Sequence, residues 1–224
     1  MRSSVVVFDV NETLSDMAPM ARRFADVGAP GHLAAAWFAA LLRDGFALAA
    51  AGSAAPFAEV GAGVLRGLLH GRQLAVPVEE AVEHVLAGFG ALDVHPDVPA
   101  GVRDLRALGL RLVTLTNGAT AVSEGLLERA GLRAEFERLL SVDDAGAWKP
   151  ARRAYEHAAQ RCGVPVAGCL LVAVHPWDVD GASRAGMRTA WVDRTGAPYP
   201  QHLRGPDLVA SGLEDLAHQL AGNG

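Results

Sequence analysis

Four short runs of mainly apolar residues, each followed by polar residues, limit most strongly how this chain can fold. They are Val5–Phe8, Leu110–Leu115, Cys169–Val174 and Arg188–Val192, and Leu139–Val142 is a candidate for a fifth. Runs without a regular apolar and polar alternation are typical of strands that are covered on both faces. The pattern therefore predicts a parallel sheet at the centre of the fold.

Helical patterns alternate with these predicted strands. They cover Val102–Leu108, Ala121–Ala130, Ala151–Cys162 and Asp180–Ala185. Strands that alternate with helices at this spacing indicate βαβ units, which build a sheet with helices on both faces. The expected fold class is α/β, with a doubly wound parallel sheet.

One stretch, residues 15–96, breaks the alternation and carries no convincing strand. It is rich in Ala and Leu, and three or four helices fit it, among them Leu33–Ala51, Phe57–Leu69 and Val78–Phe89. About eighty residues without a strand are too many for one crossover connection. We therefore expect a helical insert over residues 15–96 and a core made of residues 1–14 and 97–224. The alternative is that these helices simply cover one face of the sheet.

Composition limits the possible partners. Half of the residues are hydrophobic and 20% are charged, so the chain can bury a core. The net charge is −5 and no cluster of Lys and Arg stands out, which argues against a nucleic-acid partner. No membrane partner is expected, since each long apolar stretch is interrupted by Gly, Pro or charge. Two cysteines, Cys162 and Cys169, and no signal peptide before the first strand indicate a cytoplasmic protein.

Polar side chains follow three of the predicted strands. They are Asp9 with Asn11, Thr116 with Asn117, and His175 with Asp178, and Lys149 lies in a loop before a helix. In open α/β sheets, ligands bind beyond the carboxyl ends of the strands. We expect these groups to converge on one cleft. Alternatively, each one caps the helix that follows it.

Four segments then resemble, in order, the four motifs of the haloacid dehalogenase (HAD) superfamily. They are DVNETL from Asp9, TNG from Thr116, the pair Lys149-Pro150, and WDVDGASRAGMRTAWV from Trp177. Tyr155, six residues after Lys149, and the pair Trp177-Asp178 are similar to the type II 2-haloacid dehalogenases in particular. The resemblance implies a Rossmann-like core, a helical cap formed by residues 15–96, and a homodimer.

The resemblance also implies roles for individual residues. Asp9 is the expected nucleophile, which displaces halide and forms an ester, and Asp178 orients or activates the water that hydrolyses it. A carboxylate nucleophile must be ionised, and the nearby charge of Lys149 favours that state. Thr116 and Asn117 can donate hydrogen bonds to Asp9 or the substrate, although an ordinary Asn-Gly turn explains them too. Tyr155 is expected to donate near Lys149, or else to be an ordinary half-buried helix residue.

Three positions depart from the dehalogenase pattern. Asn11 replaces an aromatic residue, and His175 replaces an asparagine and is either a proton-transfer group or a structural histidine. In the cap, Phe38 follows Trp37 where the family carries an arginine expected to hold the halide and the substrate carboxylate. We assign all three positions to substrate binding, and Arg22, Arg23 and Arg43 are candidates to replace the arginine.

The main alternative function is a Mg²⁺-dependent phosphatase of the same superfamily. Its general acid would fall at Asn11, which cannot transfer a proton at neutral pH. A motif IV acid would fall at Ala173 or Val174, so that only Asp178, with Asp180 beside it, remains for a cation that prefers several oxygen ligands. A second alternative is a HAD-fold protein without hydrolase activity. The sequence favours metal-independent dehalogenation of a small, partly apolar molecule, with no metal site and no cofactor.

Overall fold

The computed structural model describes residues 3–222. The chain divides into two compact units, one formed by the residues up to Ser15 together with those from Asp93 onward, and one formed by Asp16–Leu92. The first unit contains every strand among the described residues, and the second is helical. The predicted α/β class is therefore confirmed, including a helical region between the first two strands. The boundaries predicted for the insert, residues 15–96, stay a prediction.

All six strands of the sheet that the described residues form are parallel, in the order β3-β2-β1-β4-β5-β6. The strands are β1 (Val5–Phe8), β2 (Arg111–Thr116), β3 (Phe136–Ser141), β4 (Cys169–Ala173), β5 (Arg188–Val192) and β6 (Leu208–Ala210). Because β1 has a partner on each side and helices on both faces, all four of its side chains are buried.

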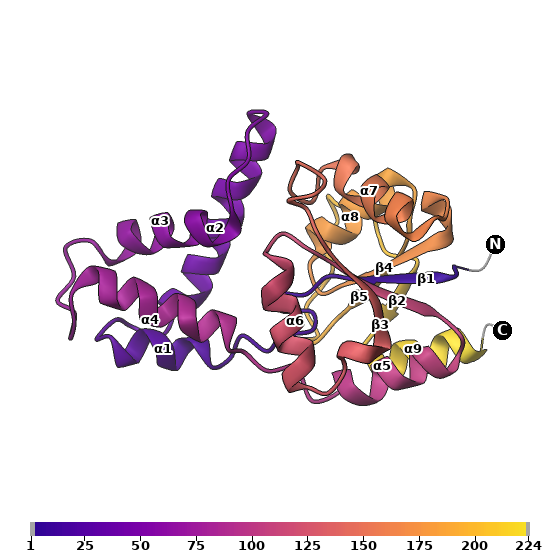
Figure 1. Cartoon of the computed structure of the whole chain (residues 1–224), viewed down its shortest axis with the longest axis horizontal. Helices are drawn as coiled ribbons and strands as arrows, with labels where there is room; N and C mark the ends of the chain where they lie inside the picture. Colours follow the sequence, from indigo (N-terminus) through magenta and orange to yellow (C-terminus); the bar gives the residue numbers. More distant parts are fainter. Residues whose placement is uncertain (1–2, 223–224) are drawn as a thin grey trace. The chain divides into compact units, whose positions relative to one another are not determined.

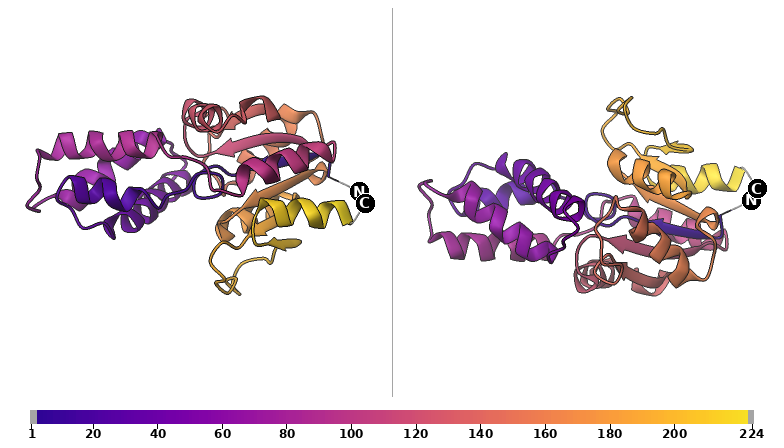
Figure 2. Two further views of the ribbon diagram at one scale, coloured as in Figure 1. Left: turned by 90° about the horizontal axis from the view of Figure 1, so that it is seen from below. Right: turned by 90° about the horizontal axis from the view of Figure 1, so that it is seen from above.

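Helices cover both faces of this sheet. They are α5 (Val98–Ala107), α6 (Thr120–Arg129), α7 (Arg152–Cys162), α8 (Pro176–Ala185) and α9 (Leu213–Gly222), with the short 3-10 helices η1 (Arg133–Glu135) and η2 (Val166–Gly168). α7 and α8 pack on one face, and α5 and α9 pack on the other (Figures 1 and 2). The apolar core on the α5 and α9 face includes Val6, Phe8, Val102 and Leu216. This doubly wound arrangement brings the carboxyl ends of β1, β2 and β4 to one edge of the unit.

The chain leaves and re-enters the sheet unit through two paired segments. Ser15 and Val94 form an antiparallel bridge, and the His95 N–H donates to the carbonyl of Leu14 at 2.9 Å. The Arg194 guanidinium donates to the carbonyl of Thr13 at 3.0 Å and to the Asp97 carboxylate at 2.7 Å. These contacts fix the segment after β1, which carries Asp9 and the residues that follow it.

The helical unit consists of α1 (Met20–Asp26), α2 (Leu33–Ala50), α3 (Phe57–Leu69) and α4 (Val78–Gly90). Its core is aromatic: the Trp37 and Phe89 rings meet edge to face with centroids 5.6 Å apart, and the Phe57 and Phe89 rings stack at 5.5 Å. Among the described residues, α2 alone has the length and apolar composition to span a membrane. Its buried face, which includes Trp37, packs against α3, and so α2 is a core helix of a globular unit.

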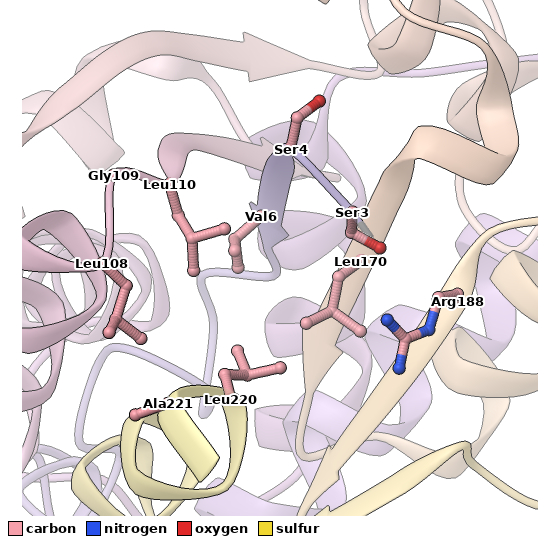
Figure 3. Close-up of a pocket in the computed structure, with 10 residues that line it drawn as sticks. All are labelled: Ser3, Ser4, Val6, Leu108, Gly109, Leu110, Leu170, Arg188, Leu220 and Ala221. Carbon is pink, nitrogen blue, oxygen red and sulfur yellow. The ribbon is translucent and has the colours of Figure 1, made fainter. Parts of the chain in front are cut away.

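A cavity of about 320 Å³ lies at the opposite end of the sheet from Asp9. Figure 3 shows the aliphatic side chains of Val6, Leu110, Leu170 and Leu220 around it, with the Arg188 guanidinium at one side. The cavity adjoins the amino-terminal ends of β1 and β4, so it is separate from the polar edge that the sequence analysis identified.

Candidate active site

Two strand ends of the sheet place the central carboxylates. Asp9 follows β1, and its N–H continues the β-ladder by donating to the Val172 carbonyl of β4 at 3.0 Å. Asp178 lies in the first turn of α8, the helix that follows β4. This helix begins at Pro176, earlier than the predicted Asp180, since Pro is well suited to the first position of a helix. Both carboxylates are buried.

Lys149 joins these two carboxylates. Its Nζ atom lies 2.7 Å from Oδ1 of Asp9 and 2.7 Å from Oδ2 of Asp178. The Lys149 side chain is fully buried, with 0% exposure, so neither ion pair is screened by bulk water. The structure thus brings together the three residues that the sequence analysis selected as catalytic.

The ionisation of the two carboxylates differs. Burial alone would raise the pKa of Asp9, but the positive charge of Lys149 and its hydrogen bond lower this pKa overall. Burial raises the pKa of Asp178, and the negative charge of Asp9 adds to that effect against the opposing charge of Lys149. Burial opposes the charge on Lys149, yet Asp178 and Asp9 together raise its pKa. The arrangement holds Asp9 as an anion and makes Asp178 the better proton acceptor.

Tyr155 supports Asp178 from α7. Its hydroxyl donates to Oδ1 of Asp178 at 2.6 Å, so each oxygen of that carboxylate has a partner. Burial, and then the charge of Asp178, raise the pKa of the Tyr155 phenol well above its usual value, which keeps it a donor. Gly181 makes room for this contact, because a Cβ atom there would lie 2.6 Å from the Tyr155 hydroxyl oxygen.

Asn117 and Thr116 hold the loops around Lys149 and β2. The Lys149 N–H donates to the Asn117 side-chain oxygen at 2.9 Å, and the Asn117 amide donates to the Lys149 carbonyl at 3.4 Å. The Thr116 hydroxyl oxygen accepts the Gly118 N–H at 3.0 Å. These contacts position the backbone of the lysine, and a direct role of either side chain toward a substrate stays a prediction.

Thr13 is a site residue that the sequence analysis missed. Its hydroxyl donates to Oδ2 of Asp9 at 2.6 Å and accepts the Val174 N–H at 3.1 Å. The two oxygens of Asp9 therefore have different partners, Lys149 on Oδ1 and Thr13 on Oδ2. The signal was present in the sequence, since Thr13 belongs to the DVNETL segment that also carries Asp9.

His175 lies on the Oδ2 side of Asp9. Its Nε2 atom is 3.1 Å from the Asn11 carbonyl oxygen, 3.7 Å from Oδ2 of Asp9 and 3.6 Å from the Glu12 carboxylate. The imidazole stacks on the Trp177 indole with ring centroids 5.1 Å apart. Asn11 thus contributes a backbone oxygen here, while a substrate contact from its buried side chain stays a prediction.

Glu12 was also missed, and its backbone is unusual. Its φ is 61°, the left-handed region that residues other than glycine seldom adopt. Burial raises the pKa of its carboxyl group, against the opposing charge of His175. Glu12 also belongs to the DVNETL segment, but its left-handed backbone depends on the tight turn after β1, which no residue type in that segment indicates.

Phe38, the departure in the insert, lies in the aromatic core of the helical unit. It is 5% exposed, and its ring centroid is 6.3 Å from that of Phe89. Of the candidate replacements for the missing arginine, Arg43 donates to the Asp44 carboxylate at 2.8 Å on the exposed side of α2. A role of Phe38 or of Arg22, Arg23 or Arg43 in binding a substrate stays a prediction.

Within residues 3–222, no group of three or more His, Cys, Asp or Glu side chains is arranged to hold a metal ion. The cation between the two central carboxylates is instead the Lys149 ammonium. Cys162 and Cys169 are buried free thiols, and burial raises the pKa of Cys169 to about 11.

Comparison with known proteins agrees with this geometry. The family model of haloacid dehalogenase-like hydrolases matches residues 4–186. The chain is 35% identical over 126 residues to haloacetate dehalogenase H-2 of Moraxella sp. (strain B), a segment that is 56% of either chain. It is 37% identical over 117 residues to an (S)-2-haloacid dehalogenase of Pseudomonas sp. (strain YL), covering 52% of this chain and 50% of that one. These matches span about half the length of the curated relatives.

Similarity to solved structures extends over nearly the whole chain. The L-2-haloacid dehalogenase of Xanthobacter autotrophicus, solved with chloropropionic acid covalently bound, aligns with a TM-score of 0.88 at 25% identity, covering 99% of this chain and 100% of that one. Together with the family match over most of the sequence, this places the protein: the chain belongs to the family of haloacid dehalogenase-like hydrolases.

Proposed function

We propose that this protein is a 2-haloacid dehalogenase that acts through a covalent ester on Asp9. The observation that carries the proposal is the buried Lys149 ammonium, which lies 2.7 Å from Asp9 and 2.7 Å from Asp178. A buried carboxylate held as an anion at a strand end, with little water around it, is a suitable nucleophile for a carbon centre. The similarity to dehalogenases, one of them solved with a covalently bound acid, supports the same chemistry.

The first step is a displacement at carbon. An oxygen of Asp9 attacks the carbon that carries the halogen, a C–O bond forms, and the halide leaves with the electrons of the C–X bond. Lys149 keeps Asp9 ionised before the attack, because its charge lowers the pKa of that carboxyl group against the effect of burial. Halide is a good leaving group and needs no proton at this step.

The second step is hydrolysis of the ester. Water attacks the carboxyl carbon of Asp9, and negative charge develops on the former carbonyl oxygen. The Lys149 ammonium stabilises this charge, and Asp178, whose pKa is raised chiefly by burial, accepts the proton of the water. The product is a 2-hydroxy acid, and Asp9 is regenerated with one oxygen from water.

The substrate class follows from the same comparison. The relatives are a haloacetate dehalogenase and (S)-2-haloacid dehalogenases, so a short halogenated carboxylic acid is the proposed substrate. We further propose, from the family resemblance, that the protein is a cytoplasmic homodimer. Gel filtration with light scattering measures the oligomeric state directly.

The phosphatase alternative fits the site less well. A divalent cation between motif I and motif IV carboxylates would need the place that the Lys149 ammonium takes, since this amine contacts both acids. Two like charges that close repel strongly in a buried setting. The residue two positions after Asp9 is Asn11, whose side-chain amide cannot act as a general acid at neutral pH.

The test is halide release from 2-chloropropionate, 2-bromopropionate and fluoroacetate, with and without a chelator. We expect release that survives the chelator and is lost in Asp9→Asn, and a mass increase on Asp9 in single-turnover samples. Asp104→Asn, an exposed substitution of the same type, is the control and should keep full activity. Phosphate release that requires Mg²⁺, without halide release, would contradict the proposal.

A further inference from the structure

The surroundings of His175 define where its ring hydrogen lies. Three oxygens face Nε2: the Asn11 carbonyl at 3.1 Å, the Glu12 carboxylate at 3.6 Å and Oδ2 of Asp9 at 3.7 Å. Carbonyl and carboxylate oxygens are acceptors only, so a nitrogen among three of them must carry a hydrogen to interact favourably. In the imidazolium form both ring nitrogens carry a hydrogen, and this form can give the Nε2 proton away.

The two oxygens of Asp9 differ in their access to solvent. Oδ1 contacts Lys149, whose side chain is 0% exposed. Oδ2 accepts from the buried Thr13 hydroxyl and lies 3.7 Å from Nε2 of His175, whose side chain is 11% exposed. That nitrogen lies 3.6 Å from the carboxylate of Glu12, whose side chain is 40% exposed. A substrate must arrive from the solvent side. Oδ2 is therefore the oxygen that reaches the substrate carbon, and Oδ1 becomes the carbonyl oxygen beside Lys149.

This assignment determines what leaves in the hydrolytic step. After attack by Oδ2, the bond to be broken in hydrolysis joins the carboxyl carbon of Asp9 to Oδ2. The departing group is thus an alkoxide, which is far more basic than a halide and needs a proton. The proton donor must lie beside Oδ2, where the structure places Nε2 of His175 and the Thr13 hydroxyl.

We propose that His175 is the general acid of the ester hydrolysis, which protonates the departing oxygen of the hydroxy acid, and that Glu12 is the residue that positions its imidazolium. The proposal rests on the ester mechanism given above. Thr13 is a weaker candidate, because an aliphatic hydroxyl is a very weak acid and this one already bridges Asp9 and Val174.

The step balances as follows. Water adds to the carboxyl carbon and gives one proton to Asp178. The tetrahedral intermediate collapses with cleavage of the bond from carbon to Oδ2, and the Nε2 proton of His175 passes to that oxygen as it leaves. Asp9 is left as a carboxylic acid that loses its proton. The site then holds two protons, one on Asp178 and the one that Asp9 loses. One of them returns to His175 and the other goes to solvent, so each turnover releases one proton with the halide.

The backbone of Glu12 supports a functional role for its side chain. A φ of 61° is unfavourable for any residue with a Cβ, and glycine would adopt it freely. The Glu12 backbone makes two hydrogen bonds: its N–H donates to the Ser15 hydroxyl at 3.3 Å, and its carbonyl oxygen lies 2.9 Å from His95 Nε2. Neither contact uses the Glu12 side chain, so its carboxylate beside His175 is the feature that glycine would lose.

The decisive experiment separates the two chemical steps in His175→Gln, which keeps an N–H donor but supplies no acidic proton. In rapid-quench assays with 2-bromopropionate, we expect a burst of about one halide per active site. We expect the ester on Asp9, followed by mass, to decay about 10²-fold more slowly than in the unmodified protein. A 2-bromo acid with fluorine on C3 forms a less basic alkoxide, which needs a proton less. With this substrate, the difference in ester decay rate between His175→Gln and the unmodified protein should be several-fold smaller. His218→Gln, an exposed histidine on α9, is the control.

The possible results are distinguishable. No halide from the unmodified protein would overturn the proposed function itself. Halide release by the unmodified protein, with ester decay at the same rate in His175→Gln, would overturn only the role of His175. Loss of both the halide burst and turnover in His175→Gln would also overturn the role of His175, since it would place this residue in the first step. If His175→Gln does not fold, His175→Ala should show the same slow ester decay.

Glu12→Gly separates strain from function. Glycine relieves the left-handed backbone, so we expect a higher melting temperature together with ester decay about tenfold slower, because the partner of the imidazolium is gone. Glu12→Gln should slow ester decay similarly without raising the melting temperature. Glu128→Gln, an exposed change on α6, should alter neither quantity. A stabilised Glu12→Gly protein with unchanged ester decay would remove Glu12 from the proposal.

Discussion

The Lys149 Nζ atom donates to Oδ1 of Asp9 at 2.7 Å, although 140 positions separate the two residues in the chain. The parallel sheet produces this contact, because the end of β1 and the loop before α7 reach the same edge. Lys149 is the only lysine of the sequence, so no neighbouring lysine can replace its charge.

Lys149→Met should remove halide release and destabilise the fold. The substitution leaves Asp9 and Asp178 buried without their cation, which typically costs about 3–5 kcal/mol of the free energy of unfolding. Urea unfolding measures the loss. Asp178→Asn in the same chain should restore part of it, since one uncompensated charge is then absent. An additive loss in the double variant would contradict the shared ion pair.

The stabilisation that Lys149 provides should depend on pH. The pKa of Lys149 is raised by Asp178 and Asp9 against burial, so its contribution is fully present below the unfolded value of about 10.5. It is lost as the pH rises through the higher folded value. Urea midpoints between about pH 9 and about pH 12, a window that begins below the unfolded value, should fall more steeply in the unmodified protein than in Lys149→Met. Equal slopes would mean that the lysine does not titrate as proposed.

Tyr155→Phe should lower activity while the fold is retained. The change removes the 2.6 Å hydrogen bond to Asp178 and leaves that buried oxygen with one partner fewer, which costs about 1–3 kcal/mol in the free energy of unfolding. We expect halide turnover to fall about tenfold, a loss of roughly 1.4 kcal/mol in transition-state stabilisation. Tyr199→Phe, at the other tyrosine of the chain, removes bonds to the Pro176 and Arg204 carbonyls and should leave turnover intact. The same loss in both variants would argue against a specific role.

Gly181→Ala should be destabilising even though it lies within a helix. A Cβ at residue 181 would come within 2.6 Å of both the Tyr155 hydroxyl oxygen and the Cβ of Pro150. Overpacking of this kind costs about 1–3 kcal/mol. Gly63→Ala in α3, where nothing lies within 4 Å, should instead stabilise its helix by about 0.5–1 kcal/mol. Urea unfolding compares the two, and equal effects would show that α8 can shift away from α7.

Much of the fold could be predicted because it follows from local pattern. The apolar run at Val5–Phe8 is buried on both faces, and the sequence shows this directly. β6, with three residues and the exposed Val209 at its centre, gives no such signal and was missed. The third strand begins at Phe136, earlier than the predicted Leu139, because it lies at the edge of the sheet, where the charged residues Glu137 and Arg138 are exposed and break the apolar run.

The candidate site was predictable as a set of residues but not as a set of contacts. Asp9, Lys149 and Asp178 follow from strand ends and motif order, and the structure brings them within hydrogen-bonding distance. Which partner each oxygen takes depends on three-dimensional detail. The Thr13 bond and the Glu12 turn depend on backbone angles after β1, and no residue type fixes those angles alone.

The short stem formed by the bridge between Ser15 and Val94 has an evolutionary consequence. The bridge holds the segment that follows β1 and Asp9 in place. The sequence between Ser15 and Val94 can therefore be lengthened, shortened or exchanged without altering the register of the sheet. The inserted helices can therefore diverge in sequence and length, while Asp9 and Lys149 are inherited unchanged.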